Sequence, residues 1–302
     1  MGDVKKNSDF WYHVAAFAMI LVWGISFLNT RVLLDAGLTP TEIFVARFTM
    51  AYLSLLLICR FKVRYTGWRD ELLFVVCGVA GGSAYFIAEN TALEYTLISD
   101  VAVLVSTAPL TTALMGAIFY RDERISFLTG VGMIIAFIGS VMLAMKDGLV
   151  WGDSIVGDLL ALLAAFVWAF YSMALKRLNK TYTTLFITRK LFFYGVLSAL
   201  PFLAMEDTQI NWETMKQPAV WGNLLYLGLI CSLAAYFIWG ITVKRIGAVR
   251  ASNYFYLSPI ISMIAAAIWF GERTTAVAYI GCVLILAGVV MAEKFKRKPA
   301  ET

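Results

Sequence analysis

The sequence predicts an all-α polytopic membrane protein with ten transmembrane helices, arranged as two inverted repeats of five helices. Three observations lead to this fold class. Hydrophobic residues make up 61% of the 302 residues and charged residues only 15%, which is not the composition of a soluble globular domain. Apolar runs of about 20 residues follow one another, each long enough to cross a bilayer core. Finally, the second half of the chain repeats features of the first half in the same order.

Each apolar run is predicted to be a helix because it is long and apolar on all sides, whereas the strands of a barrel would alternate. The first run follows Lys5 and Lys6, as a signal peptide would. It is longer than the apolar region of such a peptide and lacks a small-residue cleavage site, so we expect it to be retained. The helices are expected at 11–34, 41–59, 71–92, 97–120, 126–145, 155–178, 183–204, 219–243, 248–270 and 276–293.

The basic residues predict which side of the membrane each loop faces. With the N-terminus in the cytoplasm, eighteen of the 25 Lys and Arg residues face the cytoplasm, three face outside and four lie within helices. This bias follows the positive-inside rule. It predicts an integral protein of a bacterial inner (plasma) membrane with both termini cytoplasmic. The basic clusters sit at helix ends, where membrane orientation explains them better than nucleic-acid binding.

An internal repeat divides the chain into residues 1–148 and 149–302. Matching residues recur at offsets that drift from 142 to 151 residues. Five helices per half is an odd number, so the second copy enters the membrane from the opposite face, which is the layout of many secondary transporters. The matching pairs are Trp23 and Trp168, Arg47 and Arg189, Tyr52 and Tyr194, Tyr85 and Tyr236, Pro109 and Pro259, Gly132 and Gly281, and Gly139 and Gly288.

Several motifs resemble a known family. They are the Trp-Gly-x-Ser-Phe of Trp23–Phe27, Ala46-Arg47-Phe48, Ala92-Leu93-x-Tyr95-Thr96, the helices with Pro109 and Pro259, and the Phe270-Gly271-Glu272-Arg273 turn. Together they resemble EamA-type members of the drug/metabolite transporter superfamily over nearly the whole chain. The resemblance implies a transporter whose relatives include exporters of amino acids and other metabolites, and some importers. Glu89 and Glu94 depart from the family pattern, which more often has apolar or basic residues there.

Polar and aromatic side chains that share helix faces predict a substrate cavity, because polar groups of membrane helices should point away from lipid. Aromatic walls with a few hydroxyls and amides suit an amphipathic organic solute better than an inorganic ion. Ordinary helix packing explains any single aromatic residue equally well. The predicted wall residues are Trp23, Ser26, Asn29, Tyr85, Trp168, Tyr171, Tyr236, Asn253 and Tyr256.

Three of the charged residues inside predicted helices are candidates for a functional role, because a charge there costs about 2.5–3.5 kcal/mol unless it faces a cavity or a partner. Arg47 and Arg189 could contact a substrate carboxylate or phosphate, or latch a gate. The alternatives are a structural tie or snorkelling toward the surface, and we favour a structural or gating role. Glu89 lies one turn after Tyr85 on the same face. Withdrawn from water, its carboxyl group could bind and release a coupling proton. If the Glu89 carboxyl group lay near the outer interface, it would instead be ionised and hydrated.

Two further sets of residues concern helix geometry. Pro109 and Pro259 are expected in mid-helix, where proline kinks the chain. Such paired breaks indicate a central site and a hinge, or else static kinks. Four glycines at seven-residue spacing predict close helix contact, either within the protein or between protomers. They are Gly132, Gly139, Gly281 and Gly288.

These features predict a secondary-active transporter that moves a small organic metabolite, an amino acid or similar solute, outward by alternating access. No Gly-x-x-x-x-Gly-Lys-Ser/Thr loop is present, which leaves the solute gradient or protons as the energy source. No cofactor or metal is expected. The main alternative is an importer on the same fold. A membrane enzyme is disfavoured because the HExxH and GxSxG motifs are absent, and a channel because no charge ring recurs.

Overall fold

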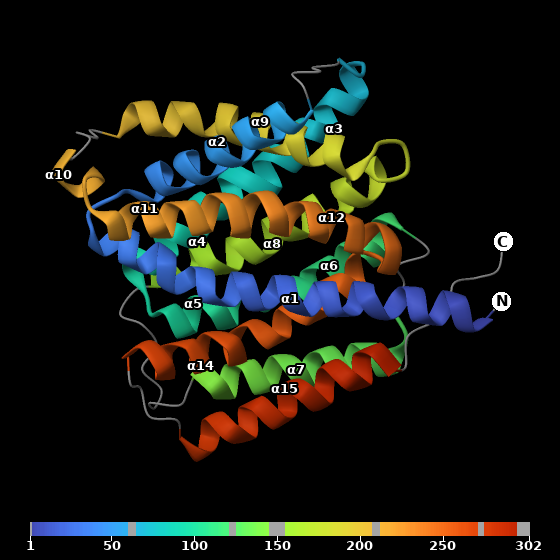
Figure 1. Ribbon diagram of the computed structural model, residues 1–302. Coiled ribbons are helices and arrows are strands. Elements are labelled where there is room, and N and C mark those ends of the chain that lie inside the picture. The colour runs from blue at the N-terminus through green and yellow to red at the C-terminus, as the bar shows by residue number, and fades with distance from the viewer. Residues whose placement is uncertain are drawn as a thin grey trace.

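The computed structural model describes residues 2–59, 65–120, 125–144, 155–206, 212–270 and 275–294. These residues are almost entirely helical and contain no β-strand. Figure 1 shows the long helices packed side by side with roughly aligned axes. Seven stretches are long and apolar enough to cross a membrane, and two shorter apolar helices cover Phe127–Met142 and Tyr279–Ala292. The protein is therefore an integral membrane protein. The seven are Asp9–Asp35, Pro40–Ile58, Trp68–Tyr95, Asp100–Phe119, Ile155–Leu178, Thr184–Met205 and Pro218–Ile246.

The first half of the chain supplies seven helical segments. The second of them, α2, begins with a capping box: the Thr39 hydroxyl accepts from the Glu42 backbone N–H, and the Glu42 carboxylate accepts from the Thr39 backbone N–H. The first helix begins at Gly2 rather than at residue 11 as predicted. The segments are α1 (Gly2–Asp35), α2 (Pro40–Ile58), α3 (Trp68–Gly78), α4 (Ala84–Tyr95), α5 (Ile98–Val105), α6 (Ala108–Phe119) and α7 (Phe127–Ala144).

The second half repeats this plan with one addition. A short helix, α10, lies within residues 205–218, which were predicted to be loop. The segments are α8 (Ile155–Leu178), α9 (Thr184–Met205), α10 (Trp212–Met215), α11 (Pro218–Leu225), α12 (Ala235–Ile246), α13 (Ala248–Ser252), α14 (Ser258–Phe270) and α15 (Ala276–Lys294).

Four helices that were predicted to be continuous are interrupted. The π-helical turn η1 (Val79–Ser83) joins α3 to α4, and the longer π-helical turn η4 (Tyr226–Ala234) joins α11 to α12. A turn at Ser106 and Thr107 separates α5 from α6, and the 3₁₀ turn η5 (Asn253–Leu257) separates α13 from α14. π-Helical turns are rare and are frequent at functional sites. Each half therefore has one π-helical and one broken helix, in corresponding positions.

The two prolines were predicted to lie in the middle of continuous helices, but neither does. Pro109 and Pro259 are in the first turns of α6 and α14, directly after the breaks. Proline is tolerated there because the first helical N–H groups need no intrahelical acceptor, and it restricts the preceding residue away from helical geometry. The prolines thus indicate two of the four interruptions, each a few residues after the break itself.

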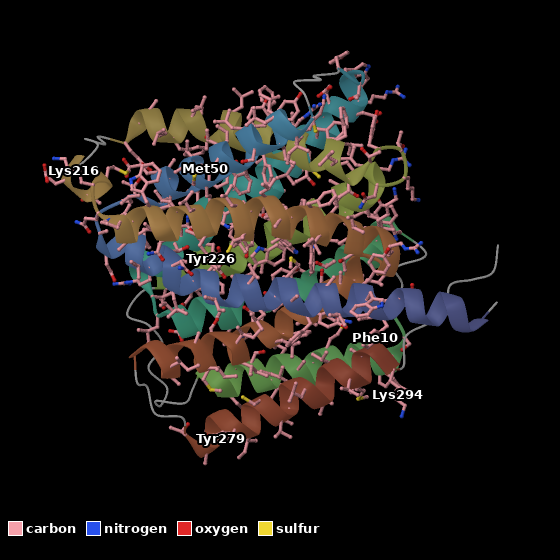
Figure 2. All side chains as sticks on the ribbon, viewed as in Figure 1. Phe10, Met50, Lys216, Tyr226, Tyr279 and Lys294 are labelled. Atoms are coloured by element: carbon pink, nitrogen blue, oxygen red, sulfur yellow. The ribbon has the colours of Figure 1, made fainter. Side chains whose placement is uncertain are left out.

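Both ends of the helical chain lie at the same end of the bundle. Figure 2 shows Phe10 of α1 and Lys294 of α15 on one side, and Lys216 and Tyr279 on the other. We call these the terminal end and the opposite end.

The glycine strip forms a contact inside the protein, between α7 and α15. A Cβ atom on Gly288 would lie 2.5 Å from the Gly132 carbonyl oxygen and 2.5 Å from the Ala136 backbone nitrogen. A Cβ atom on Gly139 would lie 2.6 Å from the Gly281 carbonyl oxygen. Backbone atoms cannot move aside as a flexible side chain can, so only glycine permits this approach.

Replacing Gly288 with Val should force α7 and α15 apart. We expect a loss of about 1–3 kcal/mol in unfolding free energy, as for other overpacked sites. Thermal unfolding of the detergent-purified protein measures it as a lower Tm. Gly222 in α11 provides the control, because a Cβ there would meet nothing within 4 Å, so Gly222→Ala should be neutral or slightly stabilising. An unchanged Tm for Gly288→Val would show that this contact is looser than described.

Candidate functional site

A cluster of five buried aromatic side chains lies where α1, α8, α12 and η5 meet. We call it the aromatic box, and it consists of Trp23, Trp168, Tyr236, Trp239 and Phe255. Trp23 packs edge-to-face on Trp168, Tyr236 and Trp239, at ring-centroid distances of 5.6, 5.8 and 5.2 Å, and stacks on Phe255 at 5.8 Å. Such geometry is favourable beyond the burial of apolar area. The box joins a residue of the first half to four of the second.

Hydrogen bonds tie the aromatic box to the two π-helical turns. The Trp23 indole N–H donates to the Cys231 carbonyl oxygen of η4 at 2.9 Å. The Tyr236 hydroxyl donates to the Gly81 carbonyl oxygen of η1 at 2.6 Å. π-Helical turns depart from the i to i−4 bonding pattern, and here a carbonyl in each turn accepts from the box.

A small cavity of about 20 Å³ adjoins the aromatic box, with room for about one water molecule. Its walls are mostly apolar and contain one charged residue, Glu89. The lining residues are Ile20, Trp23, Ser26, Phe27, Tyr85, Phe86, Glu89, Val105, Trp168, Tyr236, Phe255 and Ser258. The site can therefore hold an organic solute only if the surrounding helices separate.

Glu89 is held within this cavity by its neighbour one turn away. The Tyr85 hydroxyl donates to Glu89 Oε1 at 2.5 Å, and both side chains are buried. The Tyr85 ring also packs on Trp168, with centroids 5.1 Å apart. The predicted shared face of Tyr85 and Glu89 is confirmed. The carboxyl group lies among aromatic rings rather than at a wet interface, and it can pair with a cation or hold a proton.

Arg47 is buried beside the cavity but does not line it. Its Nε donates to the Ser232 hydroxyl at 2.9 Å, and its guanidinium carbon lies 4.2 Å from the centroid of Phe86, a wall residue. Ser232 in turn donates to the Leu227 carbonyl oxygen within η4. Nη2 of Arg47 has no hydrogen-bond partner among the described residues. Arg47 thus links α2 to the π-helical turn η4 and to the cavity wall.

Arg189, the repeat counterpart of Arg47, lies elsewhere. It is near the start of α9, with its guanidinium carbon 5.2 Å from the centroid of Phe186. It lines a separate pocket together with Glu71 and Lys190. The two arginines are thus not brought together.

Five predicted wall residues line the cavity, namely Trp23, Ser26, Tyr85, Trp168 and Tyr236, and the predicted charged residue Glu89 lines it too. Four others lie away from it. Asn29 donates to Asn223 Oδ1 at 2.6 Å toward the opposite end, and Tyr171 packs behind Trp168 at 4.8 Å between centroids. Asn253 and Tyr256 are buried but absent from the cavity lining.

Phe255 and Ser258 line the cavity in place of Asn253 and Tyr256. In a 3₁₀ turn, residues three apart eclipse each other, so Asn253 and Tyr256 share one face and Phe255 and Ser258 share another. We expected the more polar pair, Asn253 and Tyr256, to face the cavity, and this prediction was wrong. Trp239 was also missed, although it lies three residues after Tyr236 on the same helix.

Four buried polar atoms around the aromatic box have no hydrogen-bond partner among the described residues. They are Trp168 Nε1, Trp239 Nε1, Asn253 Oδ1 and the Tyr256 hydroxyl. Leaving a buried polar group unpaired costs about 1–3 kcal/mol. Two indole N–H donors of the aromatic box therefore lack acceptors among the described residues.

The terminal end is closed by contacts between the two halves. Nδ1 of His13 lies 2.8 Å from the Tyr254 hydroxyl. The Tyr182 hydroxyl donates to Asp70, and Lys190 is ion-paired with Glu71.

The opposite end is closed in a similar way. Glu206, which follows α9, accepts from the Thr41 hydroxyl at 2.5 Å and from the Thr39 hydroxyl at 2.7 Å, at the start of α2. The Asn29–Asn223 contact lies on the same side. Contacts between the two halves thus occur at both ends of the bundle.

Comparison with known proteins agrees with this architecture. The model of the EamA-like transporter family matches residues 10–145 and again residues 155–293. A probable terminal-alkyne amino-acid exporter of Streptantibioticus cattleyicolor is 27% identical, over 96% of this chain and 95% of that protein. A probable amino-acid metabolite efflux pump of Escherichia coli is 25% identical, over 91% and 92%. One solved crystal structure shares the fold with a TM-score of 0.72 at 21% identity, over 95% of this chain and 98% of that chain. The family model matches both halves of the sequence, and the apolar helices surround a buried aromatic cavity. This chain is therefore a membrane transporter of the EamA-like family.

Proposed function

We propose that the protein is a secondary-active exporter of a small metabolite that carries an amino group, an amino acid or a similar amphipathic solute. The observation that carries this proposal is the buried carboxyl group of Glu89 beside the aromatic box. An ammonium group is attracted both to a carboxylate and to the faces of aromatic rings. No other charged residue lines the cavity among those described.

The unpaired indole N–H groups support an acceptor group on the same solute. Trp168 and Trp239 lie on the second-half side of the box, and their Nε1 atoms lack acceptors among the described residues. A carboxylate or carbonyl oxygen of the solute would supply them. An amphipathic solute with an amine at one end and an acceptor at the other matches both features. The printed names of the two amino-acid exporter relatives agree with this class.

The proposed transporter crosses the membrane ten times. Its two inverted halves are residues 1–148 and 149–302. Three observations support it: the family model matches the chain twice, the interruptions occur in corresponding helices of each half, and α1 begins at the same end at which α15 ends. Inverted repeats with broken helices at a central site are typical of secondary transporters.

Alternating access is the mechanism that the size of the cavity supports. A space of about 20 Å³ cannot admit an amino acid, and contacts between the halves lie at both ends. Transport would require the terminal-end contacts and the opposite-end contacts to open in turn. Pro109 and Pro259, next to the breaks in α5–α6 and α13–α14, are the proposed hinges, and protons are the proposed coupling ion through Glu89.

The basic residues and the relatives' names support orientation and direction. We place the terminal end in the cytoplasm of a bacterial inner membrane, because the basic clusters of the sequence gather there. Outward transport agrees with the exporter and efflux names of relatives. An importer would use the same cavity with the opposite gradient.

Counterflow in proteoliposomes tests this function. We expect the purified protein, preloaded with an unlabelled amino acid chosen from a thermal-shift panel, to accumulate the labelled solute transiently and with saturation. Simple sugars and inorganic ions should produce no counterflow, because they lack an amine for Glu89. Flux that never saturates would indicate a channel, and counterflow with neutral sugars alone would refute the assigned solute class.

A further inference from the structure

One hydroxyl group of the central cavity has no partner among the residues that the structure describes. It belongs to Ser258, which lines the cavity and is only 4% exposed. The other three hydroxyls of the lining all donate to protein acceptors; they belong to Ser26, Tyr85 and Tyr236. Leaving a buried hydroxyl unpaired is unfavourable, so the Ser258 hydroxyl is available to a ligand.

The backbone around Ser258 is held by contacts with α1. Ser258 is the first residue of α14 and follows Phe255 of the aromatic box by three residues. One turn further on, the Ser262 hydroxyl donates to the Gly24 carbonyl oxygen at 3.1 Å. A Cβ atom on Gly24 would lie 3.6 Å from the Ser258 carbonyl oxygen. The unpaired hydroxyl therefore belongs to a helix end that is packed against α1.

The Glu89 carboxylate lines the same space and has one oxygen atom without a donor. Its Oε1 accepts from the Tyr85 hydroxyl at 2.5 Å, and no described residue donates to Oε2. The cavity measures about 20 Å³, which is room for about one water molecule. Groups that line so small a space can contact the same small ligand. Ser258 and Glu89 therefore present two acceptors, one of them anionic, to a single donor group.

Two kinds of organic cation are compatible with a carboxylate beside aromatic rings. A quaternary ammonium group binds to aromatic faces and needs no hydrogen bond. A primary ammonium group has three N–H donors and is close to a water molecule in size. The cavity favours the primary ammonium group, because three methyl groups would leave both acceptors unpaired and would not fit a space for one water molecule.

We propose that Ser258 is a specificity-determining residue, which selects a solute with a primary ammonium group against N-methylated forms of the same solute. This inference rests on the proposed function. One N–H of the ammonium group donates to Glu89 and a second donates to Ser258 Oγ. Each N-methyl group removes a donor and adds volume. The remaining lining is largely apolar and includes Ile20, Phe27 and Val105, so an amino acid with an aliphatic side chain is a suitable probe.

Thermal-shift titrations of the full-length protein in detergent measure this selectivity without transport. The probes are L-leucine, N-methyl-L-leucine and N,N,N-trimethyl-L-leucine, which share one side chain and one carboxylate. A ligand that binds only the folded state raises Tm with its concentration, and the titration gives Kd. We expect the trimethyl compound to bind at least about ten-fold more weakly than leucine, because it loses hydrogen bonds made by a charged group. The monomethyl compound should lie between the two.

Ser258→Ala should lower the selectivity. We expect leucine to bind about ten-fold more weakly and the trimethyl compound to bind as before, so that the ratio of their Kd values falls about ten-fold. The ratio compares two ligands on one protein, so it does not depend on the yield of folded protein. Alanine also suits this place in the fold: Ala108 is the matching residue before Pro109, and it begins α6 as Ser258 begins α14.

Ser262→Ala is the matched control. It removes a buried hydroxyl from the same helix, but Ser262 does not line the cavity, so the ratio of Kd values should not change. Equal Kd values for leucine and the trimethyl compound in the wild type would overturn the proposal, and so would the absence of a Tm shift with leucine. A ratio in Ser258→Ala equal to that in Ser262→Ala would overturn it as well.

Counterflow separates this inference from the proposed function. Selective binding of leucine without counterflow would refute the exporter and leave the assignment of Ser258 standing. Counterflow of leucine and of the trimethyl compound at equal rates would support a carrier and refute the role of Ser258.

Discussion

Replacing Glu89 with Gln is expected to lower counterflow at least about ten-fold, because a charge-assisted hydrogen bond contributes about 1.5–3 kcal/mol. Glutamine has nearly the same shape and can still accept from the Tyr85 hydroxyl, which now lies 2.5 Å from Glu89 Oε1. It cannot pair with an ammonium group as an anion, nor exchange a proton. The protein should therefore fold with a nearly unchanged Tm while losing affinity for the solute.

The same variant should flatten the dependence of transport on pH. If Glu89 carries the coupling proton, the wild-type rate changes as the carboxyl group gains or loses it, and the Gln variant has no such step. Initial counterflow rates, measured from acidic to mildly alkaline buffer on both proteins, give the comparison. A pH profile that keeps its shape in Glu89→Gln would remove Glu89 from the coupling mechanism.

Two further variants make the result specific. Glu94 lies on the same helix but is exposed and does not line the cavity, so Glu94→Gln should keep flux within about two-fold of wild type. Tyr85→Phe removes one hydrogen bond to the carboxyl group and keeps the charge. It should reduce flux less than Glu89→Gln, by a factor consistent with about 1 kcal/mol.

The sequence predicts the helices and half of the site because both depend on patterns that it displays directly. Apolar runs of membrane length place the helices, since lipid leaves no other regular structure with its backbone bonds satisfied. Helical spacing places Trp23 beside Ser26 and Tyr85 beside Glu89, and all four line the cavity. Such predictions need only the geometry of one helix.

What the sequence does not predict depends on irregular backbone. The π-helical turns η1 and η4 have no proline to mark them, and a carbonyl in each turn accepts from a donor in another helix, Tyr236 for η1 and Trp23 for η4. In the 3₁₀ turn η5, Phe255 lines the cavity and Asn253 and Tyr256 do not. Arg47 and Arg189 occupy matching sequence positions, yet one contacts Ser232 and the other lines a separate pocket with Glu71 and Lys190. Residues at matching positions of the two halves can have different surroundings, because each half packs against different partners.

Replacing Arg47 with Ala should cut transport at least about ten-fold without preventing insertion of the protein into the membrane. Removing this buried cation eliminates a hydrogen bond that contributes about 1.5–3 kcal/mol and an aromatic contact that contributes about 0.5–2 kcal/mol. Both contacts join α2 to parts of the site: Ser232 lies in the π-helical turn η4, and Phe86 is a cavity wall. Membrane yield and Tm measure folding, and counterflow measures transport. Normal flux in this variant would show that Arg47 has no part in the mechanism.

The kinetic pattern of Arg47 variants distinguishes a gate from a solute contact. Arg47 does not line the cavity, so we expect kcat to fall while KM changes little, because the loss affects the conformational step rather than binding of the solute. Arg47→Lys should be nearly as impaired as Arg47→Ala, since lysine cannot lie flat on Phe86 and donate sideways to Ser232 at once. Ser232→Ala, which keeps the cation and its aromatic contact, should be milder. A rise in KM with kcat preserved, in both Arg47→Ala and Arg47→Lys, would place the guanidinium on the solute instead, and the carboxylate-binding role assigned to Trp168 and Trp239 would pass to Arg47.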